Sequence, residues 1–195
     1  MATLILASSS PRRRELIHTL GLDVHIIEND VDETISEHLS PASVAKTLAL
    51  RKARQAYEDW PDKDAGAVVI GSDTVVALDD QILGKPADDT DACHMIGQLA
   101  GRKHEVYTAI AVIRLDDGKE YVSHLKTDVY MKPLSPERIK RYVATGESMD
   151  KAGAYGIQGL GSILVDRIDG DYFNVVGLPL SLLVELLKMF DIDVL

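Results

Sequence analysis

Cysteine is nearly absent from this chain, because Cys93 is the only one among 195 residues. An intrachain disulfide is therefore excluded. Cys93 stands beside Met95 and Ile96 in a helical pattern, which predicts a buried and unreactive thiol.

Long apolar runs are also missing. No stretch approaches the roughly 20 residues that a membrane-spanning helix needs. Residues 4–7 are too few for the apolar region of a signal peptide, and no basic segment precedes them. We therefore expect a soluble, cytoplasmic protein with no membrane partner.

Positive charge is scarce, since 21 Lys and Arg stand against 31 Asp and Glu and the net charge is −10. Such an acidic chain is poorly suited to nucleic-acid polymers and anionic membranes. Its length and its 46% hydrophobic content predict one domain over residues 1–195, large enough for a sizeable core and with room for a small lobe.

Several familiar site motifs do not occur. There is no Walker-type phosphate loop, no Gly-x-Gly-x-x-Gly after a strand and no Gly-x-Ser-x-Gly turn around a nucleophile. No histidine has zinc-ligand spacing with another histidine or with Cys93. These absences argue against P-loop, dinucleotide-binding, serine-hydrolase and zinc sites.

Strand and helix patterns alternate along the chain, which predicts a layered α/β fold. Three Ser-Pro pairs mark helix starts, since Ser is a good N-cap and Pro suits the first helical position. We expect helices at 11–20, 41–57, 89–99, 136–143 and 178–190, and strands at 4–7, 24–27, 67–78, 81–83, 106–115, 120–130 and 162–168.

The start of the first helix carries the wrong charge. Ser8, Ser9 and Ser10 are followed by Pro11 and then by three arginines at 12–14. The free N–H groups of a helix start are already positive, so each arginine there should cost a few tenths of a kcal/mol. A bound polyanion would compensate them, although arginines pointing into solvent are the simpler alternative.

Asp73 is a second anomaly, because it lies in the strongly apolar pattern at 68–76. A buried carboxylate must be paired, bound to a metal or placed at a strand end that faces a cleft. Gly71 and Ser72 precede it and suggest a bulge that turns its side chain. The alternative is a capping or salt-bridging aspartate.

Lysines and further carboxylates complete the candidate set. Lys52 falls on the apolar face of its predicted helix, where its ammonium either reaches water or points into a cleft. Asp32 and Glu33 follow the second strand, and Glu33 with Asp73 could hold Mg²⁺ together with phosphate oxygens. Lys85 lies on a rigid turn between Gly84 and Pro86.

The glycine-rich segment at 153–161 has neither helix nor strand periodicity. Glycine permits close backbone approach, so this segment is either a ligand-facing loop or a plain surface loop. Basic groups, hydroxyls and two candidate metal carboxylates together suit phosphoryl chemistry on a nucleotide-like substrate.

Six of these segments resemble the motifs of the Maf family, in the family's order and over nearly the whole chain. They are Leu6–Arg13, Val31–Glu33, Lys52–Ala53, Gly71–Thr74, Leu83–Pro86 and Asp150–Gly159. The resemblance implies an elongated three-layer α/β/α fold, similar to inosine triphosphate pyrophosphatases, with a cleft between two lobes. It also implies a homodimer and an association with septum formation.

The resemblance further implies a pyrophosphatase that cleaves a nucleoside triphosphate into a monophosphate and pyrophosphate, using a divalent cation such as Mg²⁺ or Mn²⁺. Asp73, Glu33 and Lys52 would be its catalytic residues, with Asp73 and Glu33 also binding the metal. The substrate-binding residues would be Ser8, Ser10, Arg12, Arg13, Thr74, Lys85 and Gln158.

Arg12, Thr74 and Gln158 resemble the subgroup that prefers dTTP and UTP, including modified pyrimidine nucleotides. The carboxamide of Gln158 offers the donor and acceptor that match the edge of thymine or uracil. Arg14 is expected to face solvent. Two alternatives stay open: a nucleotide-binding regulator of cell division without catalysis, and a pyrophosphatase for purine triphosphates such as ITP.

Overall fold

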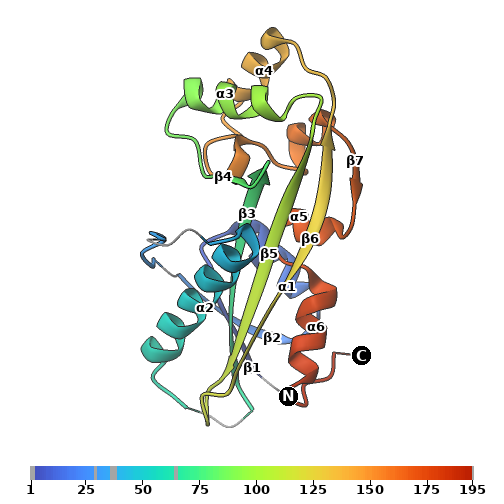
Figure 1. Cartoon of the computed structure of the whole chain (residues 1–195). Helices are drawn as coiled ribbons and strands as arrows, with labels where there is room; N and C mark the ends of the chain where they lie inside the picture. The colour runs from blue at the N-terminus through green and yellow to red at the C-terminus, as the bar shows by residue number, and fades with distance from the viewer. Residues whose placement is uncertain (1–2, 29, 36–38, 64–65, 195) are drawn as a thin grey trace.

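The computed structural model describes residues 3–28, 30–35, 39–63 and 66–194. These residues form a seven-stranded sheet in the order β2-β1-β3-β5-β6-β7, with β4 paired to β3 (Figure 1). Strands β2, β1 and β3 are parallel, and the remaining pairs are antiparallel. The strands are β1 (Thr3–Ala7), β2 (Asp23–Ile27), β3 (Val68–Leu78), β4 (Gln81–Leu83), β5 (Lys103–Arg114), β6 (Glu120–Met131) and β7 (Val165–Asp169).

Helices cover both faces of this sheet. They are α1 (Pro11–His18), α2 (Pro41–Asp59), α3 (Asp89–Leu99), α4 (Pro136–Val143), α5 (Tyr172–Val176) and α6 (Leu180–Lys188). The three Ser-Pro pairs do begin helices, at α1, α2 and α4. None of the described helices combines the length and apolar character needed to cross a bilayer.

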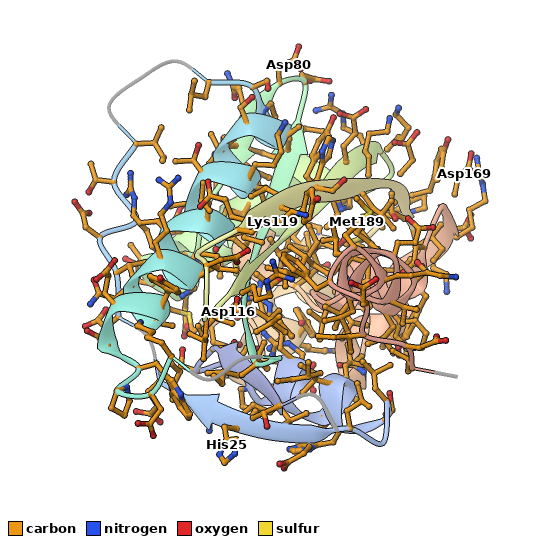
Figure 2. The ribbon with its side chains drawn as sticks, turned by 90° about the horizontal axis from the view of Figure 1, so that it is seen from below. His25, Asp80, Asp116, Lys119, Asp169 and Met189 are labelled. Atoms are coloured by element: carbon orange, nitrogen blue, oxygen red, sulfur yellow. The ribbon has the colours of Figure 1, made fainter. Side chains whose placement is uncertain are left out.

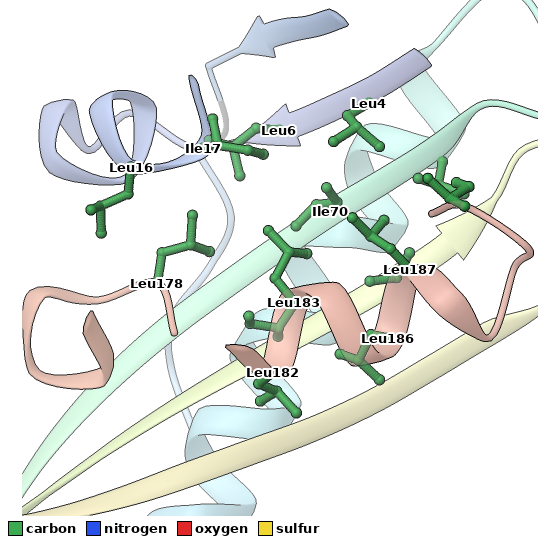
Figure 3. Close-up of a cluster of buried hydrophobic side chains, with 14 of the residues drawn as sticks. Leu4, Leu6, Leu16, Ile17, Ile70, Leu178, Leu182, Leu183, Leu186 and Leu187 are labelled. Atoms are coloured by element: carbon green, nitrogen blue, oxygen red, sulfur yellow. The ribbon is translucent and has the colours of Figure 1, made fainter. Parts of the chain in front are cut away.

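Alternation along the strands divides the core into layers, because successive side chains of a strand point to opposite faces. Leu4 and Leu6 of β1 pack with α1 and α6, as Figure 3 shows, whereas Ile5 and Ala7 pack with α2. The three-layer α/β/α prediction is therefore confirmed.

The molecule is elongated, and its ends have different cores (Figure 1). Helices α2 and α6 flank the sheet at one end, while α3 and α4 pack on the other ends of β3, β5 and β6. Figure 2, a view along this long direction, places His25 of β2 and Asp169 of β7 on opposite edges of the sheet.

Two sequence predictions about local structure outside the cleft are wrong. Residues 162–164 belong to a 3₁₀ helix, η2 (Gly159–Leu164), so β7 begins only at Val165. Cys93 is partly exposed and lines a hollow with Ile139. The buried face of α3 consists of Ala92, Ile96 and Leu99, and Cys93 lies one position beyond it.

Candidate active site

A cleft of about 1070 Å³ lies between the two ends of the molecule. One side comes from the β1–α1 junction, α2 and the segment at 30–35, and the other from β4 and the segment at 150–158. All the site residues that the sequence predicts line this one cleft: Ser8, Ser10, Arg12, Arg13, Glu33, Lys52, Asp73, Thr74, Lys85 and Gln158.

The β1–α1 junction brings two of the predicted serines into the cleft. Ser8 is only 4% exposed, and its hydroxyl accepts a hydrogen bond from the Ser10 amide at 3.1 Å. Ser10 occupies the N-cap of α1, but its side chain makes no capping hydrogen bond, contrary to the prediction. The hydrogen bond at this junction instead runs from the Ser10 amide to the Ser8 hydroxyl. The first-turn N–H groups of α1 receive no cap from the Ser10 side chain.

The three arginines of α1 have different surroundings. Arg13 donates from Nε to the Gly177 carbonyl at 2.7 Å and from Nη2 to Thr74 Oγ1 at 2.9 Å. Burial lowers the pKa of Arg13, and the nearby carboxylate of Asp73 opposes that shift. Arg12 forms an ion pair with Asp150, and its Nη1 atom lies 3.2 Å from Oδ2 of that carboxylate.

Arg14 is not the solvent-facing residue that the sequence predicts. Its Nε donates to the Ser8 carbonyl at 3.1 Å, and its guanidinium lies 3.4 Å from Glu28. Arg14 therefore ties α1 back to the end of β1. Carboxylates outside α1 offset the three positive charges: Asp150 for Arg12, Asp73 for Arg13 and Glu28 for Arg14.

Lys52 joins two carboxylates in the cleft. Its Nζ lies 2.6 Å from Asp73 Oδ1 and 2.7 Å from Glu33 Oε1. Burial raises the pKa of Asp73, and the positive charge of Lys52 opposes that rise. Burial also acts to raise the pKa of Glu33, but the hydrogen bond to Lys52 and the positive charges of Lys52, Lys85 and Arg13 together outweigh that effect and lower the pKa.

Gly71 explains how Lys52 comes so close to Asp73. The pairing of β3 with β5 runs without interruption from Val68 to Ala77, so the predicted bulge at Gly71 and Ser72 is wrong. A Cβ atom on Gly71 would lie 2.6 Å from the amide nitrogen of Ala53 and closer still to the carbonyl of Ala49. Glycine here lets α2 pack directly on β3.

Lys85 and Gln158 approach the cleft from the opposite side, and both side chains are exposed. The glycine-rich segment contains two 3₁₀ helices, η1 (Ala152–Ala154) and η2. The Glu147 carboxylate accepts hydrogen bonds from the amides of Leu160 at 3.1 Å and Gly161 at 3.2 Å. Glu147 thereby anchors the turn that follows Gln158.

Asp73 and Glu33 offer carboxylate oxygens, the kind of ligand that a divalent cation prefers. Among the described residues, no group of three or more His, Cys, Asp and Glu side chains could hold a metal ion. Asp73 and Glu33 nevertheless meet around one positive charge, that of Lys52. Mg²⁺ is commonly bound by one or two carboxylates together with phosphate oxygens and water.

Sequence reasoning missed four residues that support the site: Thr108, Asp150, Asn174 and Gly177. Thr108 and Asn174 are fully buried polar residues linked to Thr74 and, through it, to Arg13. The sequence offered two signals. Asp150 begins the motif Asp150–Gly159, and the side chain of Asp171 caps α5 by accepting from the Asn174 amide at 2.7 Å.

Comparison with known proteins identifies the family to which this chain is similar. A family model described as Maf-like protein matches residues 3–190. A dTTP/UTP pyrophosphatase of Moorella thermoacetica is 50% identical over 194 residues, covering 100% of this chain and 98% of that protein. One of Symbiobacterium thermophilum is 50% identical, covering 97% of this chain and 95% of that protein. The solved structure of the Staphylococcus aureus Ham1 protein aligns with a TM-score of 0.48 and 16% identity, over 84% of this chain and 79% of that one.

Proposed function

Because this chain belongs to the Maf family, we propose that it is a nucleoside triphosphate pyrophosphatase that hydrolyses dTTP and UTP. Relatives that match its full length at about half identity carry that activity in their names. The observation that carries the proposal is the buried carboxylate of Asp73, held by Lys52 in the same cleft as the arginines of α1.

Positively charged groups line the cleft where the triphosphate would bind. Arg12 and Arg13 lie in the first turn of α1, where backbone N–H groups also favour an anion. Lys85 adds a third positive charge from the opposite side of the cleft. We assign phosphate binding to these groups, with Ser8 and Ser10 shaping the junction beside them.

Asp73 is suited to take a proton from water. In the proposed reaction a water oxygen bonds to the α-phosphorus, and the bond from that phosphorus to the α–β bridging oxygen breaks. The products are the nucleoside monophosphate and pyrophosphate, and the proton of the water passes to Asp73. Burial raises the pKa of Asp73, which brings it nearer to that of a useful base.

We also propose a divalent cation, Mg²⁺ or Mn²⁺, held by Asp73, Glu33 and phosphate oxygens, which would offset the charge that develops on the leaving pyrophosphate. Lys52 contacts both carboxylates, so it supplies positive charge to the same place and keeps them together. Gln158 supports pyrimidine selectivity, because its exposed carboxamide can donate to and accept from the edge of thymine or uracil.

A nucleotide panel tests the proposal. Purified protein is assayed for pyrophosphate release from dTTP, UTP, dCTP, dATP, GTP and ITP, with Mg²⁺, with Mn²⁺ and with EDTA. We expect dTTP and UTP to be hydrolysed far faster than the others and EDTA to stop the reaction. Asp73→Asn should lower kcat by roughly a hundredfold or more while nucleotide binding persists.

Other results would contradict specific parts of the proposal. Nucleotide binding without pyrophosphate release under either metal would indicate a regulator, and preferential hydrolysis of ITP would indicate a purine enzyme. Full activity in EDTA would contradict the proposed requirement for a divalent cation. The homodimer, the cytoplasmic location and the link to septum formation stay predictions.

A further inference from the structure

A chain of hydrogen bonds runs from Arg13 into the core. Arg13 Nη2 contacts Thr74 Oγ1 at 2.9 Å, and Thr74 Oγ1 lies 2.9 Å from Thr108 Oγ1. Thr108 Oγ1 in turn lies 2.6 Å from the backbone carbonyl of Asn174. Thr108 and Asn174 are both fully buried.

The chemistry of these groups allows only one direction for the hydrogens. A carbonyl cannot donate, so the Thr108 hydroxyl must donate to Asn174. Its single hydrogen is then used, and the Thr74 hydroxyl must donate to Thr108. A guanidinium has no acceptor, so Arg13 donates to Thr74. The hydroxyl hydrogen of Thr74 therefore points away from the cleft and toward Thr108.

The inner end of this chain is held firmly. The Asn174 carboxamide donates to the Val106 carbonyl at 3.0 Å and to Thr127 Oγ1 at 2.9 Å, and it accepts from the Thr108 amide at 3.1 Å. Breaking such a buried network leaves unpaired polar groups, so its members resist displacement. Asn174 therefore provides a rigid reference point for Thr108.

A second support comes from the residue that ends α5. The Gly177 carbonyl accepts from Arg13 Nε at 2.7 Å and from the buried Ser72 hydroxyl at 3.1 Å. Arg13 thus has two anchored nitrogens. Within the described part of the chain, its Nη1 atom has no hydrogen-bond acceptor, while the side chain lines the cleft.

We propose that Thr74 is a positioning residue, which together with Thr108 and Asn174 aims Arg13 at the substrate phosphates and makes no hydrogen-bond donation to the substrate itself. This inference rests on the proposed function and deepens it, because it assigns the orientation of a phosphate-binding arginine to a buried relay. It also revises the sequence expectation that Thr74 binds the substrate.

Thr108→Val is the sharpest test, because Thr108 does not line the cleft and valine keeps its shape. If Thr108 acts through Arg13, the variant should lose roughly ten- to hundredfold in kcat/KM for dTTP, because the misaimed Arg13 would lose a hydrogen bond between charged groups, that to the phosphate. Thr108→Ser, which keeps the hydroxyl, should recover most of that loss. Wild-type kcat/KM in Thr108→Val would overturn the inference.

Ile113→Val is the matched control. Ile113 lies on the same strand β5, is equally buried and packs in an apolar part of the core outside the chain to Arg13. We expect a similar loss of thermal stability with kcat/KM within about threefold of wild type. Equal losses of kcat/KM in the two variants would show a general packing effect and overturn the inference.

Two further measurements isolate Arg13. In an Arg13→Ala background, Thr108→Val should cause no further loss of kcat/KM, whereas independent effects would multiply. In ¹H–¹⁵N spectra of arginine side chains without nucleotide, the protected Arg13 signals should exchange faster in Thr108→Val than in Ile113→Val. Unchanged spectra would contradict the relay. An inactive wild type would instead overturn the proposed function, and the spectra would still test the relay.

Discussion

The ammonium of Lys52 lies 2.6 Å from Asp73 Oδ1, and the two side chains are only 12% and 10% exposed. This ion pair joins α2 to β3 at the floor of the cleft. It also resolves the alternatives that the sequence left open, because Lys52 lines the cleft and its ammonium pairs with Asp73.

The first prediction concerns the stability of this ion pair. Lys52→Met should destabilise the protein by about 3 kcal/mol, because it leaves the Asp73 carboxylate buried without that partner. Adding Asp73→Asn should recover part of the loss, since the buried charge is then removed. Urea unfolding measures the free energies, and a double variant less stable than Lys52→Met would refute this explanation.

Gly71 gives the second prediction. Gly71→Ala should cost about 2 kcal/mol or more, because the new methyl group would overlap the backbone of α2 at Ala49 and Ala53. Activity should fall as well, since Lys52 moves with α2. The control is Gly97→Ala in the exposed middle of α3, where an added Cβ would meet no atom of a neighbouring element within 4 Å. Alanine should stabilise the helix there by up to about 1 kcal/mol. If the two variants have equal unfolding midpoints, the close packing has no energetic role.

The third prediction concerns the anchor of the Gln158 turn. Glu147→Ala removes the acceptor for the Leu160 and Gly161 amides, so the ratio of kcat/KM for dTTP over dCTP should fall about tenfold. Gln158→Ala should have the same effect. Glu185→Ala, an exposed change on α6, should leave the ratio unchanged. A lower kcat with an unchanged ratio of kcat/KM for dTTP over dCTP would show that Glu147 does not contribute to base selection.

His104 supplies the fourth prediction, a dependence of stability on pH. Burial lowers the pKa of His104 from 6.5 to about 4, although Asp128 opposes that shift. Between these values the unfolded chain binds a proton that the folded protein does not. Stability is therefore present above pH 6.5 and is lost as the pH falls toward 4, by about 3 kcal/mol.

His104→Gln tests this linkage, since glutamine can still contact the Tyr155 hydroxyl that lies 2.7 Å from His104 Nε2. The free energy of unfolding should then change less between pH 7 and pH 4.5 than it does in wild type. His94→Gln, at an exposed position of α3, should keep the wild-type slope. The same slope in all three proteins would show that His104 is not the group responsible.

Local patterns predicted much of the secondary structure because they report local preferences. Pro11, Pro41 and Pro136 each occupy the first position of a helix, and Ser40 and Ser135 cap theirs with side-chain hydrogen bonds. The prediction failed at residues 162–164, where η2 takes the place of a strand. That segment is shaped by the Glu147 carboxylate, which is distant in sequence.

The sequence by itself determined the α/β class, the motifs of the family and ten of the residues that line the cleft. Only the tertiary structure decided their partners: Arg13 with the Gly177 carbonyl 164 positions away, Arg12 with Asp150, and Lys52 with both Asp73 and Glu33. The physical reason is that hydrophobic periodicity indicates only which face of an element is buried. A hydrogen bond or ion pair requires atoms within about 3 Å of each other, and that separation is set by the packing of segments far apart in the chain.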